Sequence, residues 1–291
     1  MLNIFAVGRV GILGAGLVVG AALASTPGIA SADPTPDPNI FSSIDVSSLL
    51  QDAFPAANSN FAISIDGFSL LQEGTATATS SMGNIAIASG ADTDATATGG
   101  FGNLAVADGL FSTAAAGAGY GNLASATDGG TATAGEGSLL AAFASETNGD
   151  ATAAGGYLDY ASASVAGSTA MAGAGNFDSA TANSLDSVAE AIQGNFNKAF
   201  SGVGGGSSFA EFGNGNDAFV LGSSTATAGG TATDVLGNND IAAILGYGSD
   251  ASAGANLTDP GNFDFAGIYG DSSTLAATGA SFLFETVPSL F

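Results

Sequence analysis

The chain has 291 residues and an extreme charge balance: two are Lys or Arg and 26 are Asp or Glu, which gives a formal net charge of −24. Binding to phosphate backbones depends on basic side chains, so this composition argues against nucleic acid as a partner. Cys and His are both absent, which excludes disulfides, thiolate sites and imidazole chemistry.

Residues 1–32 have the organisation of a secretory signal peptide. Arg9 lies in a short first segment, an apolar segment comes next, and Ala30, Ser31 and Ala32 stand before Asp33. The apolar segment is short for a transmembrane span of about 20 residues, and such small residues are typical of a cleavage site. We therefore expect a cleaved signal peptide and a protein that is secreted or held in the cell envelope.

Residues 33–73 differ in composition from the rest of the chain. They begin with a proline-rich leader and then alternate apolar and polar residues over positions 60–71, as a strand would. A stack of repeats needs a cap that shields its first rung. We therefore assign residues 33–73 to a leader and an N-terminal cap.

Residues 74–182 form a first repeat array of about six units. Two alanine columns recur every 18 or 19 residues: Ala76, Ala95, Ala114, Ala132, Ala151 and Ala170, and then Ala78, Ala97, Ala116, Ala134, Ala153 and Ala172. Each unit holds two short alternating runs separated by Gly and Asn, which predicts two strands and two turns. A single short unit cannot bury its own face, whereas stacked units can. The predicted fold is therefore mainly β, a parallel β-solenoid of the β-helix or β-roll type.

A column of larger side chains lies between the alanine columns: Ile85, Leu104, Leu123, Leu140, Tyr160 and Phe177. We expect this column to face the interior, because large side chains pack well against small alanines. The alternative is an exposed apolar stripe, which would imply self-association. A second column, Asn84, Asn103 and Asn122, comes after glycines in successive turns, and we interpret it as a structural asparagine ladder.

Residues 183–206 interrupt this pattern. Their apolar side chains have helical spacing, and glycines come after them: Leu185, Val188, Ile192, Phe196 and then Gly202. The sequence predicts a short helical insert here and then a flexible Gly-rich joint.

Residues 207–280 form a second array with a longer unit, because Gly222, Gly246 and Gly270 recur every 24 residues. The same two-strand pattern persists with larger turns. Residues 281–291 alternate apolar side chains and are expected to form a C-terminal cap strand.

Several acids near expected turns would suit a hard cation through oxygen ligands. They are Asp92, Asp94, Asp108, Asp128, Asp150, Asp217, Asp240, Asp250 and Asp264. The repeat motif of calcium-binding β-rolls is absent, so we interpret them as solvated turn residues and predict no metal, cofactor or catalytic residue. Lys198, in the expected helical insert, is the one basic residue after the signal segment. We therefore predict that the chain is not an enzyme; the alternative is a carbohydrate-active β-helix enzyme that uses Asp/Glu pairs.

Threonine recurs at alternate positions of the alanine runs. One column contains Thr77, Thr96, Thr133 and Thr152, and the next contains Thr75, Thr113, Thr131 and Thr169. Regular threonine ranks on a flat solenoid face order water, so an ice- or surface-binding solenoid is a further alternative. Asp, Ala and Met interrupt both columns, and β-propensity explains the threonines more simply.

Several of these motifs resemble known families. The signal end "ASADP", the runs "GNLAVA" and "TATAG" and the segment "GNNDIAAILG" resemble secreted Ala/Gly/Thr-rich repeat proteins of the mycobacterial type. The runs "GNLAVADG" and "ATATG" are more distantly similar to the head repeats of trimeric autotransporter adhesins. The second resemblance implies a β-roll that binds host surfaces, although the units of this chain are longer than those of the heads.

We expect a secreted or cell-envelope structural and interaction protein, adhesin-like and without catalytic activity. Its expected partners are components of the cell envelope or of a host surface, with a homo-oligomer as an alternative. Acids clustered in a groove on one solenoid face would favour the enzyme, whereas evenly scattered acids would favour the interaction protein.

Overall fold

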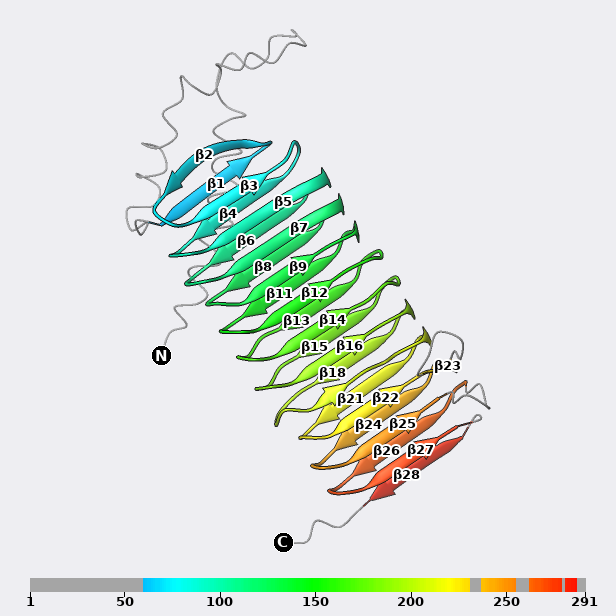
Figure 1. Ribbon diagram of the computed structural model, residues 1–291. Helices are drawn as coiled ribbons and strands as arrows, with labels where there is room; N and C mark the ends of the chain where they lie inside the picture. Colours follow the sequence, from blue (N-terminus) through cyan, green and yellow to red (C-terminus); the bar gives the residue numbers. More distant parts are fainter. Residues whose placement is uncertain (1–59, 231–236, 255–261, 279–280, 287–291) are drawn as a thin grey trace, which may run out of the picture. The chain divides into compact units, whose positions relative to one another are not determined.

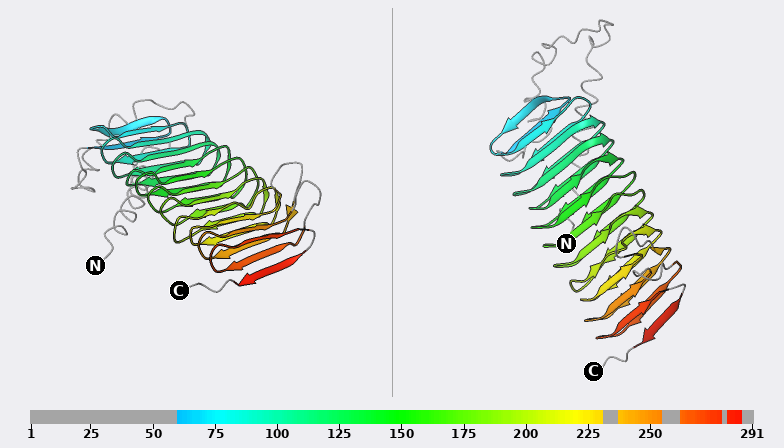
Figure 2. Two further views of the ribbon diagram at one scale, coloured as in Figure 1. Left: turned by 60° about the horizontal axis from the view of Figure 1, so that its bottom comes forward. Right: turned by 45° about the vertical axis from the view of Figure 1, so that its right-hand side comes forward.

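The computed structural model describes residues 60–230, 237–254, 262–278 and 281–286, and every regular element in these ranges is a β-strand. The described chain winds into a β-solenoid of about 10 turns, as predicted. Figure 1 shows the strands stacked as successive coils, and Figure 2 shows the same coils from two other directions. The expected signal peptide and leader lie outside the described residues.

Two long sheets carry the stack. The strands of sheet A, in spatial order, are β2 (Phe68–Glu73), β1 (Phe61–Ile65), β4 (Ile85–Ser89), β6 (Leu104–Asp108), β8 (Leu123–Thr127), β11 (Ala141–Ser145), β13 (Tyr160–Ala163), β15 (Ser179–Ala182), β18 (Lys198–Ser201), β21 (Asp217–Leu221), β24 (Ile241–Leu245), β26 (Phe265–Tyr269) and β28 (Phe282–Thr286).

The strands of sheet B, in spatial order, are β27 (Thr274–Ala277), β25 (Asp250–Ala253), β22 (Thr225–Ala228), β19 (Ser207–Ser208), β16 (Val188–Ala191), β14 (Thr169–Ala172), β12 (Asp150–Ala153), β9 (Thr131–Ala134), β7 (Thr113–Tyr120), β5 (Asp94–Phe101) and β3 (Thr77–Ser80), with β10 (Gly137–Ser138) beside β7. A small third sheet contains β17 (Gly194–Asn195), β20 (Gly213–Asn214) and β23 (Gly237–Asn238).

Each coil contributes one strand to sheet B and one to sheet A. We call the turn from sheet B to sheet A the BA corner, and the turn from sheet A to the next strand of sheet B the AB corner. Equivalent strands of successive coils pair in parallel. The first two strands differ, because β1 pairs antiparallel with both β2 and β4 and so starts the stack with a hairpin.

Alanine fills the interior of the first coils. Ala95 and Ala97 of β5 are buried, and so are Ala105 and Ala107 of β6. Both sheets therefore point methyl groups inward, and the larger side chain of Leu104 lies on the outer face, half-buried. The prediction that the larger column faces inward is wrong except at Leu140, which is buried at a BA corner, because two facing rows of methyl groups leave no room for leucine between the sheets.

The register also corrects the membership of these columns. Leu123 pairs with Ala141 rather than with Leu140, and Tyr160 pairs with Ser179 rather than with Phe177. In the first unit, Ala95 pairs with Ala78 rather than with Ala76. Turn lengths vary by one or two residues between coils, so simple spacing misplaces residues that lie near a turn.

The predicted helical insert is wrong. Residues 183–206 contain β16, β17 and β18, which continue the coils without interruption. Ala189 pairs with Ala170, and Ala199 pairs with Ala180, each at the repeat of the first array. The helical spacing of the apolar residues is coincidental here, because neighbouring coils supply the backbone hydrogen bonds that a helix would otherwise make internally.

The 24-residue unit of the second array is confirmed by the pairing of Ala218 with Ala242 and of Ala242 with Ala266. Larger residues enter the interior in these coils, since Val220 and Ile244 are fully buried. The strand β28 pairs in parallel with β26 and lies at the end of sheet A. Of the expected cap strand, residues 287–291 lie outside the described residues.

Candidate interaction surfaces and a buried polar column

The acids singled out from the sequence lie in different parts of the solenoid. Asp92, Asp108 and Asp128 lie at or beside AB corners, Asp94, Asp150 and Asp250 lie on the outer face of sheet B, and Asp217 lies on that of sheet A. Within the described ranges, no group of three or more acids could hold a metal ion. Asp240 and Asp264 are fully buried, so their interpretation as solvated turn residues is wrong.

Lys198 lies on the outer face of β18, where its Nζ is 3.9 Å from Asp217 Oδ1. Burial raises the pKa of Asp217, and the lysine charge partly offsets this effect. The side chain of Lys198 is 68% exposed and that of Asp217 is 42% exposed, so solvent and salt screen the pair and it adds little to stability.

The threonine columns lie on the outer face of sheet B. Four strands carry two outward threonines each: Thr77 and Thr79, Thr96 and Thr98, Thr131 and Thr133, Thr225 and Thr227. Thr79 pairs with Thr96, and Thr133 pairs with Thr152, but acids interrupt the next column, because Asp94 pairs with Thr77 and Asp150 with Thr131. The backbone of this face is regular, but no threonine column continues beyond two neighbouring coils, since Ala115 follows Thr96 and Met171 follows Thr152.

The BA corner contains a buried polar column. Its members, one per coil, are Asn84, Asn103, Asn122, Asp159, Asp178, Asn197, Asn216, Asp240 and Asp264, with Leu140 in the remaining coil. The Oδ1 atom of each member accepts the backbone N–H of the equivalent residue in the next coil, as in Asn103 N–H to Asn84 Oδ1 at 2.8 Å. The predicted asparagine ladder is therefore present, although the bonds that link successive coils run from backbone to side chain.

The four aspartates were not placed in this column from the sequence: Asp159 and Asp178 were not singled out, and Asp240 and Asp264 were interpreted as turn acids. Their signal was available, because Asp159, Asp178 and Asn197 succeed one another at intervals of 19 residues. The intervening Leu140 obscured the repeat. Asparagine and aspartate have almost the same shape, so either can occupy the same place between coils.

The position before this column has a left-handed backbone in every coil. Glycine occupies it in the first coils, as at Gly102 with φ 77°, but Phe177 and Phe196 occupy it later with φ 61° each. Bulky residues rarely adopt this conformation. The two rings stack with centroids 5.0 Å apart, which offsets part of the strain.

A second ladder runs along the outside of the same corner. Exposed asparagines donate from Nδ2 to Oδ1 of the next member, through Asn176, Asn195, Asn214, Asn238 and Asn262. Exposed side-chain bonds of this kind contribute little to stability. The ladder keeps the corner uniform and polar beside the exposed phenylalanine rings.

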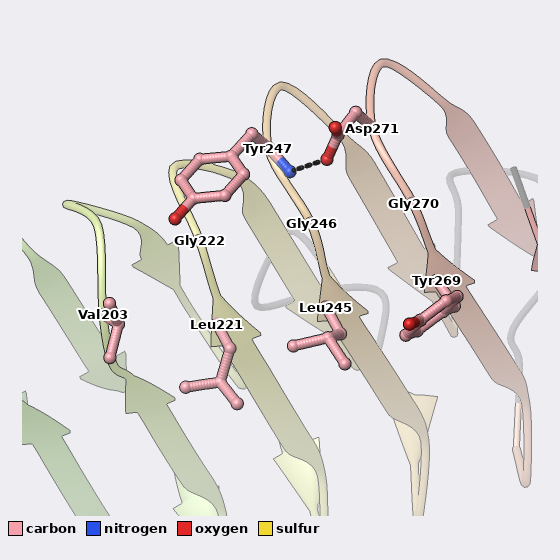
Figure 3. Close-up of a pocket in the computed structure, with 9 residues that line it drawn as sticks. All are labelled: Val203, Leu221, Gly222, Leu245, Gly246, Tyr247, Tyr269, Gly270 and Asp271. Atoms are coloured by element: carbon pink, nitrogen blue, oxygen red, sulfur yellow. Dashed lines mark hydrogen bonds between the residues drawn. The ribbon is translucent and has the colours of Figure 1, made fainter. Parts of the chain in front are cut away.

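A groove lies at the AB corner of the last coils, with a volume of about 470 Å³. Its floor is the backbone of Gly222, Gly246 and Gly270, and a Cβ built on Gly222 would lie 1.8 Å from Gly246 O. Glycine is therefore required there by the close approach of the coils. Figure 3 shows Leu221, Leu245 and Tyr269 in one row along the groove and the ring of Tyr247 above Gly222.

The two tyrosines of the groove are 55% and 56% exposed. Asp271 is also exposed, and its Oδ1 accepts the backbone N–H of Tyr247 at 2.8 Å. The groove thus combines aromatic rings, aliphatic side chains and one carboxylate, and its row of Leu221, Leu245 and Tyr269 has one member per coil.

Comparison with protein-family models, curated proteins and solved structures finds no match to this chain. Among the described residues, no helix is long and apolar enough to span a membrane.

Proposed function

We propose that this chain is a non-catalytic structural and interaction protein of the cell envelope or extracellular space. In this proposal the groove of the last coils binds a neutral polysaccharide. The observation that carries it is the exposed row of Leu221, Leu245 and Tyr269, with Tyr247 facing it across a glycine floor. Such a row runs along the solenoid axis and suits an extended polymer.

The backbone of the groove favours a sugar over a peptide strand. The floor glycines already donate their N–H groups: Gly222 to Val203 O at 2.7 Å, Gly246 to Leu221 O at 2.9 Å and Gly270 to Leu245 O at 3.0 Å. A peptide that binds by adding a strand needs unpaired backbone groups, and this floor does not offer them. Exposed tyrosine rings suit the apolar faces of sugars, because each ring has one apolar body and one polar tip.

Charge further limits the kind of polymer that the groove can bind. The chain has a formal charge of −24, and Asp271 lies in the groove itself, so polyanions would be repelled. Hydroxyl groups of a neutral polymer would instead donate to the carboxylate. Four coils contribute side chains to the groove, which corresponds to roughly 14 Å along the axis at the usual spacing of strands.

The proposed absence of catalysis is supported by the distribution of acids. They lie on two outer faces, at corners and in the buried column, rather than together in the groove. A glycosidase mechanism needs two carboxyl groups on either side of the scissile bond. Among the residues that the structure describes, Asp271 is the one acid that lines the groove.

Affinity electrophoresis tests the proposal. The chain is run through gels that contain dextran, mannan or hydroxyethyl cellulose, and we expect at least one of these polymers to retard it. The double variant Tyr247→Ala/Tyr269→Ala should lose the retardation. Tyr120→Ala is the matched control, because Tyr120 is 66% exposed but lies at a BA corner of the first array.

Two outcomes would overturn the proposal. The first is the absence of retardation by all three polymers, and the second is retardation that the double variant retains. Light scattering after size exclusion tests whether a second copy of this chain occupies the groove. A dimer that the double variant dissociates would assign the groove to a second copy of this chain instead.

A further inference from the structure

The asparagines of the buried polar column use both ends of their side chains. Oδ1 accepts a backbone N–H, and Nδ2 donates to a glycine carbonyl in the next coil. Asn197 Nδ2 lies 3.1 Å from Gly213 O, and Asn216 Nδ2 lies 3.1 Å from Gly237 O. The glycine carbonyl at this place therefore faces a hydrogen-bond donor.

Asp159 and Asp178 occupy the same place in two adjacent coils. Their Oδ1 atoms accept the N–H groups of Asp178 at 2.9 Å and Asn197 at 2.8 Å. Their Oδ2 atoms are buried and have no hydrogen-bond partner among the described residues. These oxygens occupy the position where the asparagines carry their donor nitrogen.

Distances from the glycines of the BA corner show where the Oδ2 atoms of Asp159 and Asp178 lie. A Cβ built on Gly156 would lie 2.3 Å from Asp159 Oδ2 and 1.6 Å from Gly175 O. A Cβ built on Gly175 would lie 2.2 Å from Asp178 Oδ2 and 1.6 Å from Gly194 O. Each carboxyl oxygen thus lies beside a glycine carbonyl of the next coil, and two acceptors face each other if the acid is ionised.

We propose that Asp159 and Asp178 are held as neutral carboxylic acids, each donating its O–H to the glycine carbonyl of the next coil, so that the solenoid has a proton-dependent seam at its BA corner. A protonated carboxyl has one donor and one acceptor, as an asparagine side chain does along this column. Ionisation removes the donor and places a charge in a dry interior, which weakens the contact between coils.

The surroundings of the two acids support this assignment. Burial raises the pKa of Asp159 to about 6. Burial also raises the pKa of Asp178 to about 7, with a further contribution from the charge of Asp159. On their other sides the pair meets Leu140 and Asn197, which carry no charge, and the described lysine lies on the outer face.

Asp240 shares these features in the second array. It is fully buried, its Oδ2 has no partner among the described residues, and burial raises its pKa to about 6. The charged group that faces it is Asp264 of the next coil, and Asn216 lies on its other side. A buried carboxyl oxygen without a partner among the described residues therefore also occurs at the BA corner of the longer repeat.

The raised pKa values of these aspartates decide whether the stability of the fold rises or falls with pH. Below pH 4 the acids are protonated in both the folded and the unfolded chain, and the full stability is present. Between pH 4 and pH 7 the unfolded chain releases protons that the folded chain keeps, so stability falls as pH rises. Well above pH 7 this contribution is constant, because Asp178 is then ionised in the folded chain as well.

Urea unfolding at pH 4, 5, 6, 7 and 8 tests the inference on the wild-type chain and on Asp178→Asn. We expect the unfolding equilibrium constant of the wild type to rise by about a thousandfold from pH 4 to pH 7 through Asp178, because each pKa unit corresponds to a factor of ten. Asp178→Asn should lose this contribution and keep the smaller rises that come from Asp159 and Asp240. Asp250→Asn is the matched control, because it removes the same charge from an exposed position of sheet B.

Equal pH profiles for Asp178→Asn and the wild type would overturn the inference, and so would an Asp250→Asn profile that loses as much of the rise as Asp178→Asn does. Infrared spectroscopy gives a second measurement that needs no variant to fold. At pH 5 the wild-type chain should show the carbonyl band of a protonated carboxylic acid that is shielded from solvent exchange. The absence of that band would also refute the assignment.

Discussion

Gly175→Ala offers the most direct test of the close contact between coils. Its added Cβ would lie 1.6 Å from Gly194 O, whereas ordinary contact begins near 3.4 Å. The next coil would have to move by about 1.8 Å against a strand spacing of about 4.8 Å. Such a shift breaks the bond from Asn176 N–H to Gly194 O. We expect the free energy of unfolding to fall by about 3–4 kcal/mol through overpacking and this lost bond.

Gly135→Ala is the matched control for this substitution. Its added Cβ would meet nothing closer than Ala154 Cβ at 3.7 Å, and neither glycine has a positive φ. The control should therefore be neutral, or stabilised by about 0.4–1 kcal/mol through the unfolded chain. Urea unfolding followed by circular dichroism measures both variants. Equal stabilities of the two variants would refute the close approach of the coils at this corner.

Three further predictions concern the same corner. Asn216→Ala should lower the free energy of unfolding by about 2–4 kcal/mol, because it leaves buried backbone groups without partners. Asn195→Ala, on the exposed ladder, should lower it by less than about 0.5 kcal/mol. Similar losses for the two variants in urea unfolding would contradict the distinction between the buried column and the exposed ladder. Phe196→Val should be less stable than Phe196→Asn by about 1–2 kcal/mol in thermal unfolding. The reason is that β-branched residues resist a φ of 61°, whereas Asn239 adopts 59° at the equivalent place. The reverse order of stabilities would contradict the proposed backbone strain at this position. Through Asp178, whose pKa is raised to about 7, the chain should lose about 4 kcal/mol of stability from pH 4 to pH 7, and a rise in stability over that range would contradict the sign.

Much of the fold could be predicted from the repeat alone. Two alanine columns at a constant interval, with turn residues between them, leave a stacked β-solenoid as the arrangement that buries every unit. The asparagine ladder could be read from the same columns. The candidate groove could not, because Tyr247 and Asp271 lie in turns, where the repeat is least regular, and their proximity depends on how successive coils bring those turns together.

The remaining features depended on contacts between distant parts of the chain. Alternation shows which residues share a face of a strand, but both faces of β6 have the same period, and the alanines of β5 on the opposite sheet decide which face of β6 is buried. The spacing of residues 183–206 suits a helix when the segment is considered alone, yet adjacent coils pair with its backbone and hold it as strands. The sequence by itself thus determined the repeat, the class of fold and the acidic surface. Only the tertiary structure decided which side chains face the interior, and therefore which aspartates lose contact with water.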